Sequence, residues 1–432
     1  MSDRPVRLGL RENAAQFALL VALNSLVGAM VGLERSVLPL VGKQEFGLAS
    51  EAAILSFIAA FGLAKAPANL TAGALAGRIG RKRVLILGWL LALPVPLLVG
   101  LAHSWSLIVL ANALLGASQG LAWSMTVVMK IDLAGPARRG LALGLNESAG
   151  YVGVALAAFA SGAIAGTFAP RTVIWVGAAA IAAAGTLAAV FLVRETAAHM
   201  AEEQRAHRSR RPETLAAAAF ASVRRPVLRA CSQAGLVNNL NDALAWGLAP
   251  LYLASHGAGP GRIGAVAGTY PAVWGLGQLG TGWLSDLVGR KRPIVAGMLL
   301  QAAALGLLVA SDGSFAGALA AAVLLGLGTA LVYPTLIAAV SDAVQPLDRA
   351  QAVGVYRFWR DAGLVAGALL AGAVADSFGS DVAIALVAGM TAGSGVWVLF
   401  SRWRTIGHDD DSYRQDRLDQ GSSTSYALRN WR

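Results

Sequence analysis

The chain of 432 residues is 56% hydrophobic and only 14% charged, with a mean hydropathy of +0.59. This composition excludes an ordinary soluble domain, in which about 25% of residues are charged. The formal net charge of +11 does not indicate a nucleic-acid partner. The basic residues lie in every second connection between apolar runs and not on one face of a soluble domain. A single cysteine, Cys231, excludes an intrachain disulfide.

Apolar runs follow one another along the whole chain. A membrane helix needs about 20 apolar residues, and twelve such runs are separated by polar turns. The first is too long for a cleaved signal peptide, so we expect it to remain as a spanning helix. The expected helices are 14–38, 51–71, 84–101, 106–129, 140–166, 172–193, 230–254, 263–284, 293–310, 315–340, 350–375 and 382–400.

The runs predict an all-α membrane protein with twelve transmembrane helices in two pseudo-symmetric six-helix bundles. The bundles are expected at 1–193 and 230–401, joined by a charged linker at 194–229 and followed by a disordered polar tail at 402–432. Lysine and arginine gather in the termini and in alternate connections, so the positive-inside rule places both termini in the cytoplasm. We expect a monomer in the cytoplasmic (inner) membrane of a bacterium, in contact with lipid.

A stretch rich in glycine and arginine occurs twice. Its copies are GALAGRIGRKR and GWLSDLVGRKR, and both 282 − 73 and 289 − 80 equal 209. An aspartate and an arginine outside these stretches recur at a displacement of 210. Matched spacing of this kind predicts an internal duplication and a duplicated network of gating charges. The residues assigned to it are Gly73, Gly80, Arg81, Asp132 and Arg139 in the first half, and Gly282, Asp286, Gly289, Arg290, Asp342 and Arg349 in the second.

This stretch resembles the signature loop G-x-L-a-D-r-x-G-R-K of the major facilitator superfamily, which joins helices 2 and 3 and has a weaker copy between helices 8 and 9. The resemblance covers nearly the whole chain and is closest in pattern to bacterial proton-coupled efflux members. It implies a secondary transporter whose helices 1, 4, 7 and 10 line a cavity while 3, 6, 9 and 12 face lipid. One departure is Gly77, where the family usually has an acid; the second copy keeps it as Asp286. The departure implies that the gate latch is weakened or lies in the second half.

Ionisable residues at membrane depth are costly unless they face water or a partner. Lys65 and Glu147 lie inside the second and fifth runs, and we expect them to pair. Protonation of Glu147 would break that pair and couple a proton to a conformational change; the alternative is a purely structural ion pair. The candidate proton-coupling residues are Glu147, Asp242, Asp361 and Lys65.

Polar residues also crowd the seventh and eleventh runs. Arg360 lies roughly 15 Å from the end of its helix, about half the hydrocarbon thickness. We expect Arg357 to pair with Asp361, which leaves Arg360 for a substrate oxyanion; the alternative is that these residues only join neighbouring helices. Glu34 and Arg35 are expected near the outer end of the first helix, in a structural role. The candidate substrate-binding residues are Asn238, Asn241, Asp242, Trp246, Arg357 and Arg360, with Trp123 and Tyr333 as aromatic walls.

The sequence contains no phosphate-binding loop, no metal-spaced cysteine or histidine set and no nucleophile–base motif. We therefore expect no enzyme activity, no cofactor and no metal, and the expected partners are a small-molecule substrate and protons. The first interpretation is proton-coupled antiport that exports small organic compounds. However, the fifth run lacks the Gly-Pro pair of drug exporters, and Asn112 stands where they commonly have an arginine. The alternative is proton-coupled uptake of an organic or inorganic anion, and a third is a transport-dead sensor or assembly partner.

Overall fold

The computed structural model describes residues 9–134, 139–197, 214–345 and 348–403. The predicted disordered tail and most of the predicted linker lie outside these residues. Within them, ten helical stretches are long and apolar enough to cross a membrane. The seventh and eighth expected spans are also helical but are not among these ten. For the seventh this agrees with the polar residues noted there.

The first half comprises six spans, two of which are interrupted at a proline. Pro39 and Pro94 lie in the first turn of a new segment, where proline is tolerated because its missing N–H has no partner to lose. The first span therefore does not stop near Pro39, as predicted, but continues to Gln44. The elements are α1 (Ala14–Arg35), α2 (Leu38–Gln44), α3 (Glu51–Ile79), α4 (Arg81–Ala92), α5 (Pro94–Gly100), α6 (Trp105–Ala134), α7 (Arg139–Ile164), α8 (Pro170–Leu187) and the π-helical η2 (Ala188–Leu192).

The second half repeats this plan and is preceded by a short helix, α10 (Leu215–Arg224). The seventh span begins at Pro226, four residues before its predicted start, and a π-helical turn interrupts its middle. Such turns are often found at functional sites. The remaining elements are α11 (Pro226–Ala243), η3 (Leu244–Leu248), α12 (Ala249–Ser255), α13 (Pro260–Val288), α14 (Lys291–Ala310), α15 (Phe315–Asp342), α16 (Arg349–Phe378) and α17 (Ser380–Phe400).

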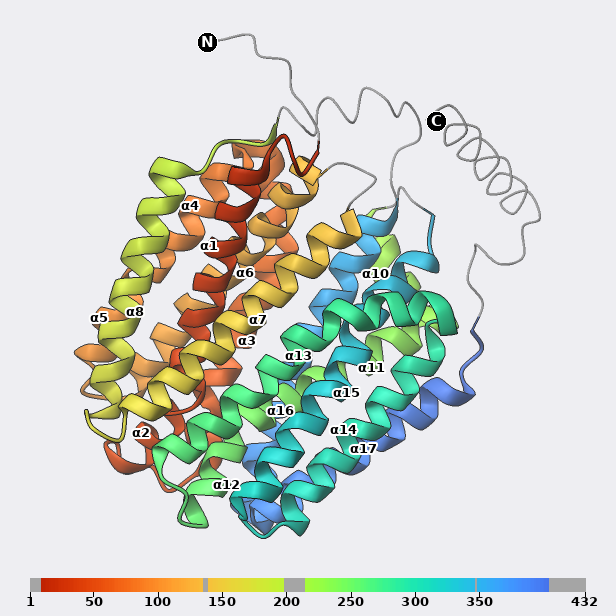
Figure 1. The fold of residues 1–432 in the computed structure, drawn as a ribbon. Coiled ribbons are helices and arrows are strands. Elements are labelled where there is room, and N and C mark those ends of the chain that lie inside the picture. Colours follow the sequence, from red (N-terminus) through yellow and green to blue (C-terminus); the bar gives the residue numbers. More distant parts are fainter. Residues whose placement is uncertain (1–8, 135–138, 198–213, 346–347, 404–432) are drawn as a thin grey trace, which may run out of the picture.

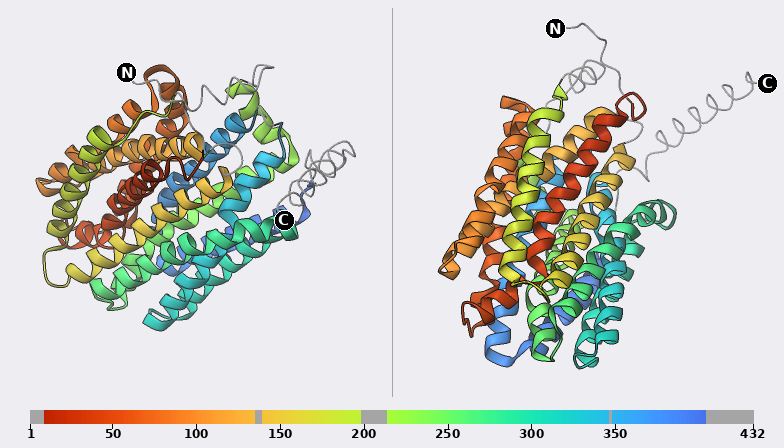
Figure 2. Two further views of the ribbon diagram at one scale, coloured as in Figure 1. Left: turned by 45° about the horizontal axis from the view of Figure 1, so that its top comes forward. Right: turned by 60° about the vertical axis from the view of Figure 1, so that its left-hand side comes forward.

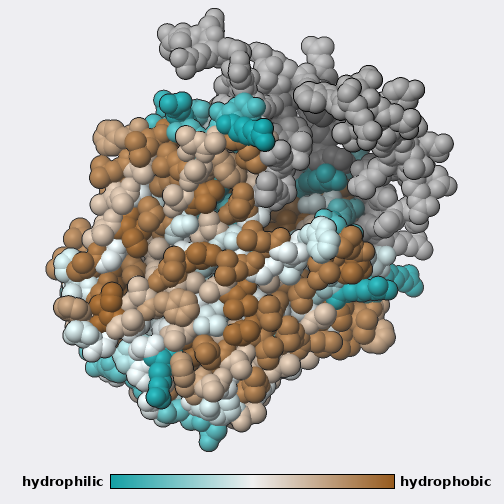
Figure 3. All heavy atoms as spheres, in the orientation of Figure 1, coloured by the Kyte–Doolittle hydropathy of each residue, from teal (hydrophilic) through white to brown (hydrophobic). Residues whose placement is uncertain are grey.

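The two halves form adjacent helical bundles (Figure 1), which the other views show as separate groups of helices (Figure 2). Hydrophobic residues cover the middle of the visible face, and hydrophilic residues gather at its two ends (Figure 3). This distribution is what a bilayer requires of a spanning protein. The predicted fold of two six-helix bundles is confirmed.

The repeated glycine and arginine stretches are mostly helical rather than loops. α3 continues to Ile79 and α13 to Val288, beyond their predicted ends. The chain turns only at Gly80 and Gly289, whose φ angles of 93° and 82° lie in the region that favours glycine. The duplication therefore extends to the backbone angle of the turn.

Among the described residues, the closest contacts between the halves lie at one end of the interface. We call the end with the Gly80 and Gly289 turns the terminal end and the opposite end the distal end. At the distal end, a Cβ on Gly162 of α7 would lie 2.5 Å from Cα of Gly264 in α13.

The interface opens toward the terminal end. Gly144 of α7 and Gly354 of α16 are equivalent in the repeat (354 − 144 = 210), and a Cβ on either would have no described atom within 4 Å. Each lies three residues before an interface residue, Glu147 or Arg357, and so shares its helix face. The structure is thus closed at the distal end and separated at the terminal end.

Candidate functional site

A cavity of about 610 Å³, part of it open to solvent, lies between the two halves. No lining residue comes from α4, α5, α8, α14 or α17 among the described elements, in agreement with the resemblance. Its lining includes all the predicted substrate-binding residues except Asn238 and Asn241, together with Lys65 and Asp361. The lining residues are Val31, Phe61, Lys65, Asn69, Gln119, Trp123, Tyr151, Val154, Asn239, Asp242, Trp246, Tyr333, Arg357, Arg360, Asp361 and Leu364.

Glu147 is held by donors from both halves. Trp123 Nε1 donates a hydrogen bond of 2.9 Å to one carboxylate oxygen, and Tyr333 Oη donates one of 2.9 Å to the other. Asn146 Nδ2 adds a third donor at 3.2 Å. Arg357 Nη2 lies 3.8 Å from the same carboxylate. Glu147 is only 5% exposed, so these contacts replace the water that a charged carboxylate would otherwise require.

Arg360 forms a second cluster. Its Nη2 lies 3.4 Å from Asp242 of α11 and donates a hydrogen bond of 3.2 Å to the Tyr151 hydroxyl of α7. Its guanidinium carbon lies 4.4 Å from the centre of the Tyr333 ring. Asp242 also accepts a hydrogen bond from Tyr270. Arg360 therefore connects the two halves directly beside Glu147.

The ion pairs differ from those predicted. Lys65 Nζ lies 3.5 Å from Asp361 and not against Glu147, while Asn69 donates a hydrogen bond of 2.6 Å to Asp361. Arg357 pairs with Glu147 instead of with Asp361. The physical reason is that α16 packs against α3, which brings Asp361 to Lys65 and turns the preceding helical turn toward α7. The predicted Lys65–Glu147 and Arg357–Asp361 pairs are wrong.

Asn238 and Asn241 are directed away from the cavity. Asn241 Nδ2 donates a hydrogen bond of 2.6 Å to Gln301 Oε1 of α14, and Gln301 Nε2 donates one of 2.8 Å to Asn238 Oδ1. Thr391 of α17 donates a further bond of 2.8 Å to Asn241. In this state both asparagines fix α11 against the outer helices, while Asn239 and Asp242 face the cavity.

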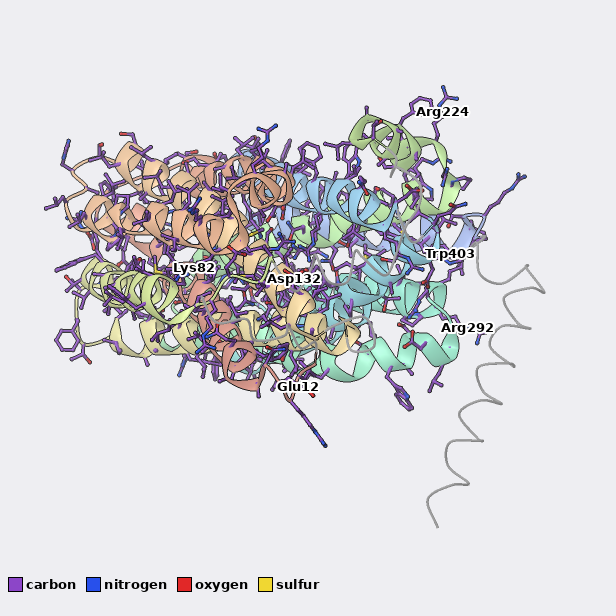
Figure 4. All side chains as sticks on the ribbon, turned by 90° about the horizontal axis from the view of Figure 1, so that it is seen from above. Glu12, Lys82, Asp132, Arg224, Arg292 and Trp403 are labelled. Atoms are coloured by element: carbon purple, nitrogen blue, oxygen red, sulfur yellow. The ribbon has the colours of Figure 1, made fainter. Side chains whose placement is uncertain are left out.

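The duplicated arginines and aspartates meet at the terminal end. Arg81 Nε lies 2.9 Å from Asp132, and Arg290 Nε lies 2.9 Å from Asp342, the equivalent pair. Labelled residues of both halves appear at this end in Figure 4. Of the other two arginines assigned to this network, Arg139 has its side chain outside the described part, and Arg349 Nε donates a hydrogen bond of 3.1 Å to the Ser341 carbonyl.

The acid missing at Gly77 has a local replacement. Glu195 follows the sixth span and accepts hydrogen bonds of 3.2 and 3.0 Å from the backbone N–H groups of Arg81 and Lys82. In the second half Asp286 lies 2.5 Å from Arg290. Burial alone would lower the pKa of Arg290, but the hydrogen bond and charge of Asp342 and the charge of Asp286 raise the pKa above its ordinary value. An acidic residue therefore lies at each turn. Glu195, from the segment after the sixth span, lies at the Gly80 turn, and Asp286, from α13 itself, lies at the Gly289 turn.

The sequence reasoning missed several functional side chains. Tyr151 follows Glu147 by four residues, so helical spacing was a signal that it shares the interface face. Tyr270 is equivalent to Phe61 in the repeat (270 − 61 = 209). Lys130 is fully buried in α6, and its Nζ donates a hydrogen bond of 3.1 Å to the Leu20 carbonyl. The only sequence signal for Lys130 was its position near the end of an apolar run.

A duplicated helical fold with a charged cavity between its halves defines a membrane transporter rather than an enzyme. The family model described as Major Facilitator Superfamily matches residues 15–236 and again residues 231–422. The chain belongs to this family.

Two comparisons are consistent with this assignment. The chain is 28% identical over 407 residues to a 3-(3-hydroxy-phenyl)propionate transporter of Escherichia coli (strain K12), covering 90% of this chain and 96% of that protein. The crystal structure of a mutant of the nucleoside transporter NupG has a similar fold, with a TM-score of 0.70 and 14% identity. That match covers 88% of this chain and 99% of the other.

Proposed function

We propose that the protein transports a small aromatic carboxylate together with protons, by alternating access of the cavity between its halves. The observation that carries this proposal is the presence of two arginines, Arg357 and Arg360, in the cavity lining. Three lining residues are basic, Lys65, Arg357 and Arg360, and two are acidic, Asp242 and Asp361. Glu147 lies 3.8 Å from Arg357, so the basic and acidic groups at the site are equal in number. The guanidinium groups in the lining, rather than its net charge, favour an anionic substrate.

Unused hydrogen-bond donors support the same substrate class. The Nε atoms of Arg357 and Arg360 are buried and have no hydrogen-bond partner among the described residues. Unpaired buried donors of this kind are uncommon in folded proteins. A substrate carboxylate would satisfy them with charge-assisted bonds, which are about twice as strong as neutral ones.

Aromatic side chains would contact the remainder of such a substrate. Trp123, Tyr151, Tyr333 and Trp246 all line the cavity, and the rings of Tyr151 and Trp123 lie 5.3 Å apart. Aromatic rings prefer tilted or offset neighbours at this separation. The name of the Escherichia coli relative, which specifies a hydroxyphenyl propionate, supports an aromatic carboxylate.

Glu147 is our proposed proton carrier. When charged it accepts a bond from Trp123 of its own half and one from Tyr333 of the other half, and protonation would weaken the Tyr333 bond that joins the halves. A proton also helps the substrate, because entry of one negative charge against a negative-inside potential is opposed by about 2.3 kcal/mol per 100 mV. Cotransport with a proton cancels that term. The export by proton exchange that the sequence favoured remains a prediction, and the same measurement tests it.

Reconstitution into liposomes tests the proposal. We expect 3-(3-hydroxyphenyl)propionate to accumulate inside vesicles when the outside is acidified, and a protonophore to abolish this accumulation. The neutral amide of the same compound serves as the control and should not accumulate. Equal transport of acid and amide would contradict an anion site, while extrusion driven by an inward proton gradient would support the export interpretation.

We also propose that the protein acts as a monomer in a bacterial inner membrane, with the terminal end in the cytoplasm. The support is the concentration of arginine and lysine in the connections at that end. The apolar outer surface would contact lipid.

A further inference from the structure

Arg35, in the last turn of α1, has a guanidinium group without a hydrogen-bond partner among the described residues. It is fully buried, and its Nε, Nη1 and Nη2 atoms all lack a partner among the described residues. Its surroundings are aromatic: its guanidinium carbon lies 5.2 Å from the Phe57 ring centre, 4.7 Å from that of Phe61 and 5.7 Å from that of Trp246. The predicted position at an accessible outer end, where the side chain would reach the interface, is therefore wrong. α2 continues the span and encloses Arg35.

A purely structural role explains this arrangement poorly. Contacts between a cation and aromatic rings offset only part of the cost of burying a charge. Arginines that stabilise a fold normally use their donors in hydrogen bonds. The unused donors of Arg35 thus indicate a partner that is absent in this state.

The aromatic residues around Arg35 also form part of the cavity wall. Phe61 and Trp246 line the cavity, as does Val31, one helical turn before Arg35. Phe61 belongs to the first half and Trp246 to the second. Movement of the halves apart at the distal end would separate these two rings and expose the guanidinium to the cavity.

We infer that Arg35 is a second anion-binding residue, which holds the substrate carboxylate when the cavity opens at the distal end. The inference rests on the proposed function and adds a site to it. Arg357 and Arg360 would bind the carboxylate in the state described here. Arg35 would bind it on the distal side of the Phe61 and Trp246 rings, with the planar guanidinium matching both carboxylate oxygens.

Glu34 is the counter-charge of Arg35. It is 1% exposed and adjacent to Arg35, and Asn112 of α6 is the one polar side chain that approaches its carboxylate in the described chain, without meeting the geometry of a full hydrogen bond. Glu34 lies close enough to balance the charge of Arg35 without using the arginine's donors. A negative charge there opposes a second carboxylate, so removing it should favour substrate binding.

Transport measured separately from each face tests the inference. Full-length protein in liposomes is given 3-(3-hydroxyphenyl)propionate from one face at a time. The orientation of the protein in the liposomes is determined by labelling a cysteine introduced at position 256 with an impermeant reagent. Arg35→Gln and Arg35→Met should raise the half-saturating concentration at the distal face about tenfold or more. The value at the terminal face should change much less. Glu34→Gln should lower the distal value.

The matched control is Arg171→Gln. Arg171 is another arginine of the distal end, but it bonds the carbonyls of Ala102 and Gly100 and does not line the cavity. This variant should leave both half-saturating concentrations unchanged. Thermal unfolding separates a structural role. Arg35→Met combined with Glu34→Gln removes the arginine without leaving the buried Glu34 carboxylate uncompensated, so this double variant should not lower the melting temperature.

Each outcome supports or overturns the inference. Unchanged distal affinity in Arg35→Gln, or a lower melting temperature of the Arg35→Met, Glu34→Gln double variant with equal losses at both faces, overturns it while leaving the proposed function intact. If the wild-type protein transports no carboxylate, the proposed function is wrong and the inference is wrong with it. If Arg35→Gln fails to insert, Arg35→Lys keeps the charge, and a wild-type distal affinity in that variant overturns the need for a planar guanidinium.

Discussion

Trp123 and Tyr333 occupy equivalent positions in the two halves (333 − 123 = 210) and donate hydrogen bonds of 2.9 Å to different oxygens of Glu147. Glu147 is itself equivalent to Arg357 (357 − 147 = 210), which lies 3.8 Å away. The internal symmetry thus brings two pairs of equivalent residues together around one carboxylate. Since one donor comes from each half, the state of Glu147 directly affects how the halves are held together.

Replacing Glu147 by glutamine should uncouple transport from the proton gradient. The amide keeps the size of the side chain but cannot release a proton. We expect gradient-driven accumulation to collapse while exchange of labelled for unlabelled substrate largely survives. Asp361→Asn is the comparison, because that carboxylate is held by Lys65 and Asn69. Unchanged gradient dependence in Glu147→Gln would assign coupling to another group, with Asp242 next to be tested.

The two equivalent gating pairs should contribute unequally to stability. The Arg81 and Asp132 side chains are each 8% exposed, whereas Asp342 is 39% exposed. Asp132→Asn should therefore lower the unfolding free energy by about 3 kcal/mol, as expected for a broken buried pair, and Asp342→Asn by under about 1 kcal/mol. Thermal unfolding in detergent measures both. A larger loss for Asp342→Asn would contradict this assignment.

Single cysteines test the sidedness of the bundle. Cys231 is fully buried and can be replaced by serine to give a background without reactive thiol. Cysteines at the exposed positions Arg292 and His256 should be labelled by an impermeant maleimide from opposite faces of the membrane, with Arg292 cytoplasmic. Labelling of both from the same face would contradict the topology.

The sequence predicted the duplication, the positions of the spans and half of the residues that line the cavity, because these depend on spacing and hydropathy alone. It did not predict the ion pairs. Whether Lys65 lies against Glu147 or Asp361 depends on the position of α3 along its axis relative to the helices packed against it. The pattern of residues within one helix does not specify that relative position. The burial of Arg35 was missed for a related reason, since Pro39 was interpreted as the end of the span rather than as the first turn of α2.

Arg360 should be needed for substrate affinity and less so for folding. Lysine keeps the charge but loses the planar fork, so Arg360→Lys should weaken binding of 3-(3-hydroxyphenyl)propionate about tenfold. Arg360→Ala should nearly abolish transport. Binding is measured by substrate protection against thermal unfolding, and Arg262→Lys, at a distal surface, is the control.

A structural role of Arg360 makes a different prediction. Its closest carboxylate is Asp242 at 3.4 Å, so removal of the arginine alone leaves a buried acid without its cation. If Arg360 only balanced that charge, Asp242→Asn combined with Arg360→Met would restore both melting temperature and transport. We expect the pair of substitutions to restore the melting temperature but not transport, because no guanidinium would remain at that position to bind the carboxylate. Recovery of transport in the double variant would rule out Arg360 as a substrate ligand.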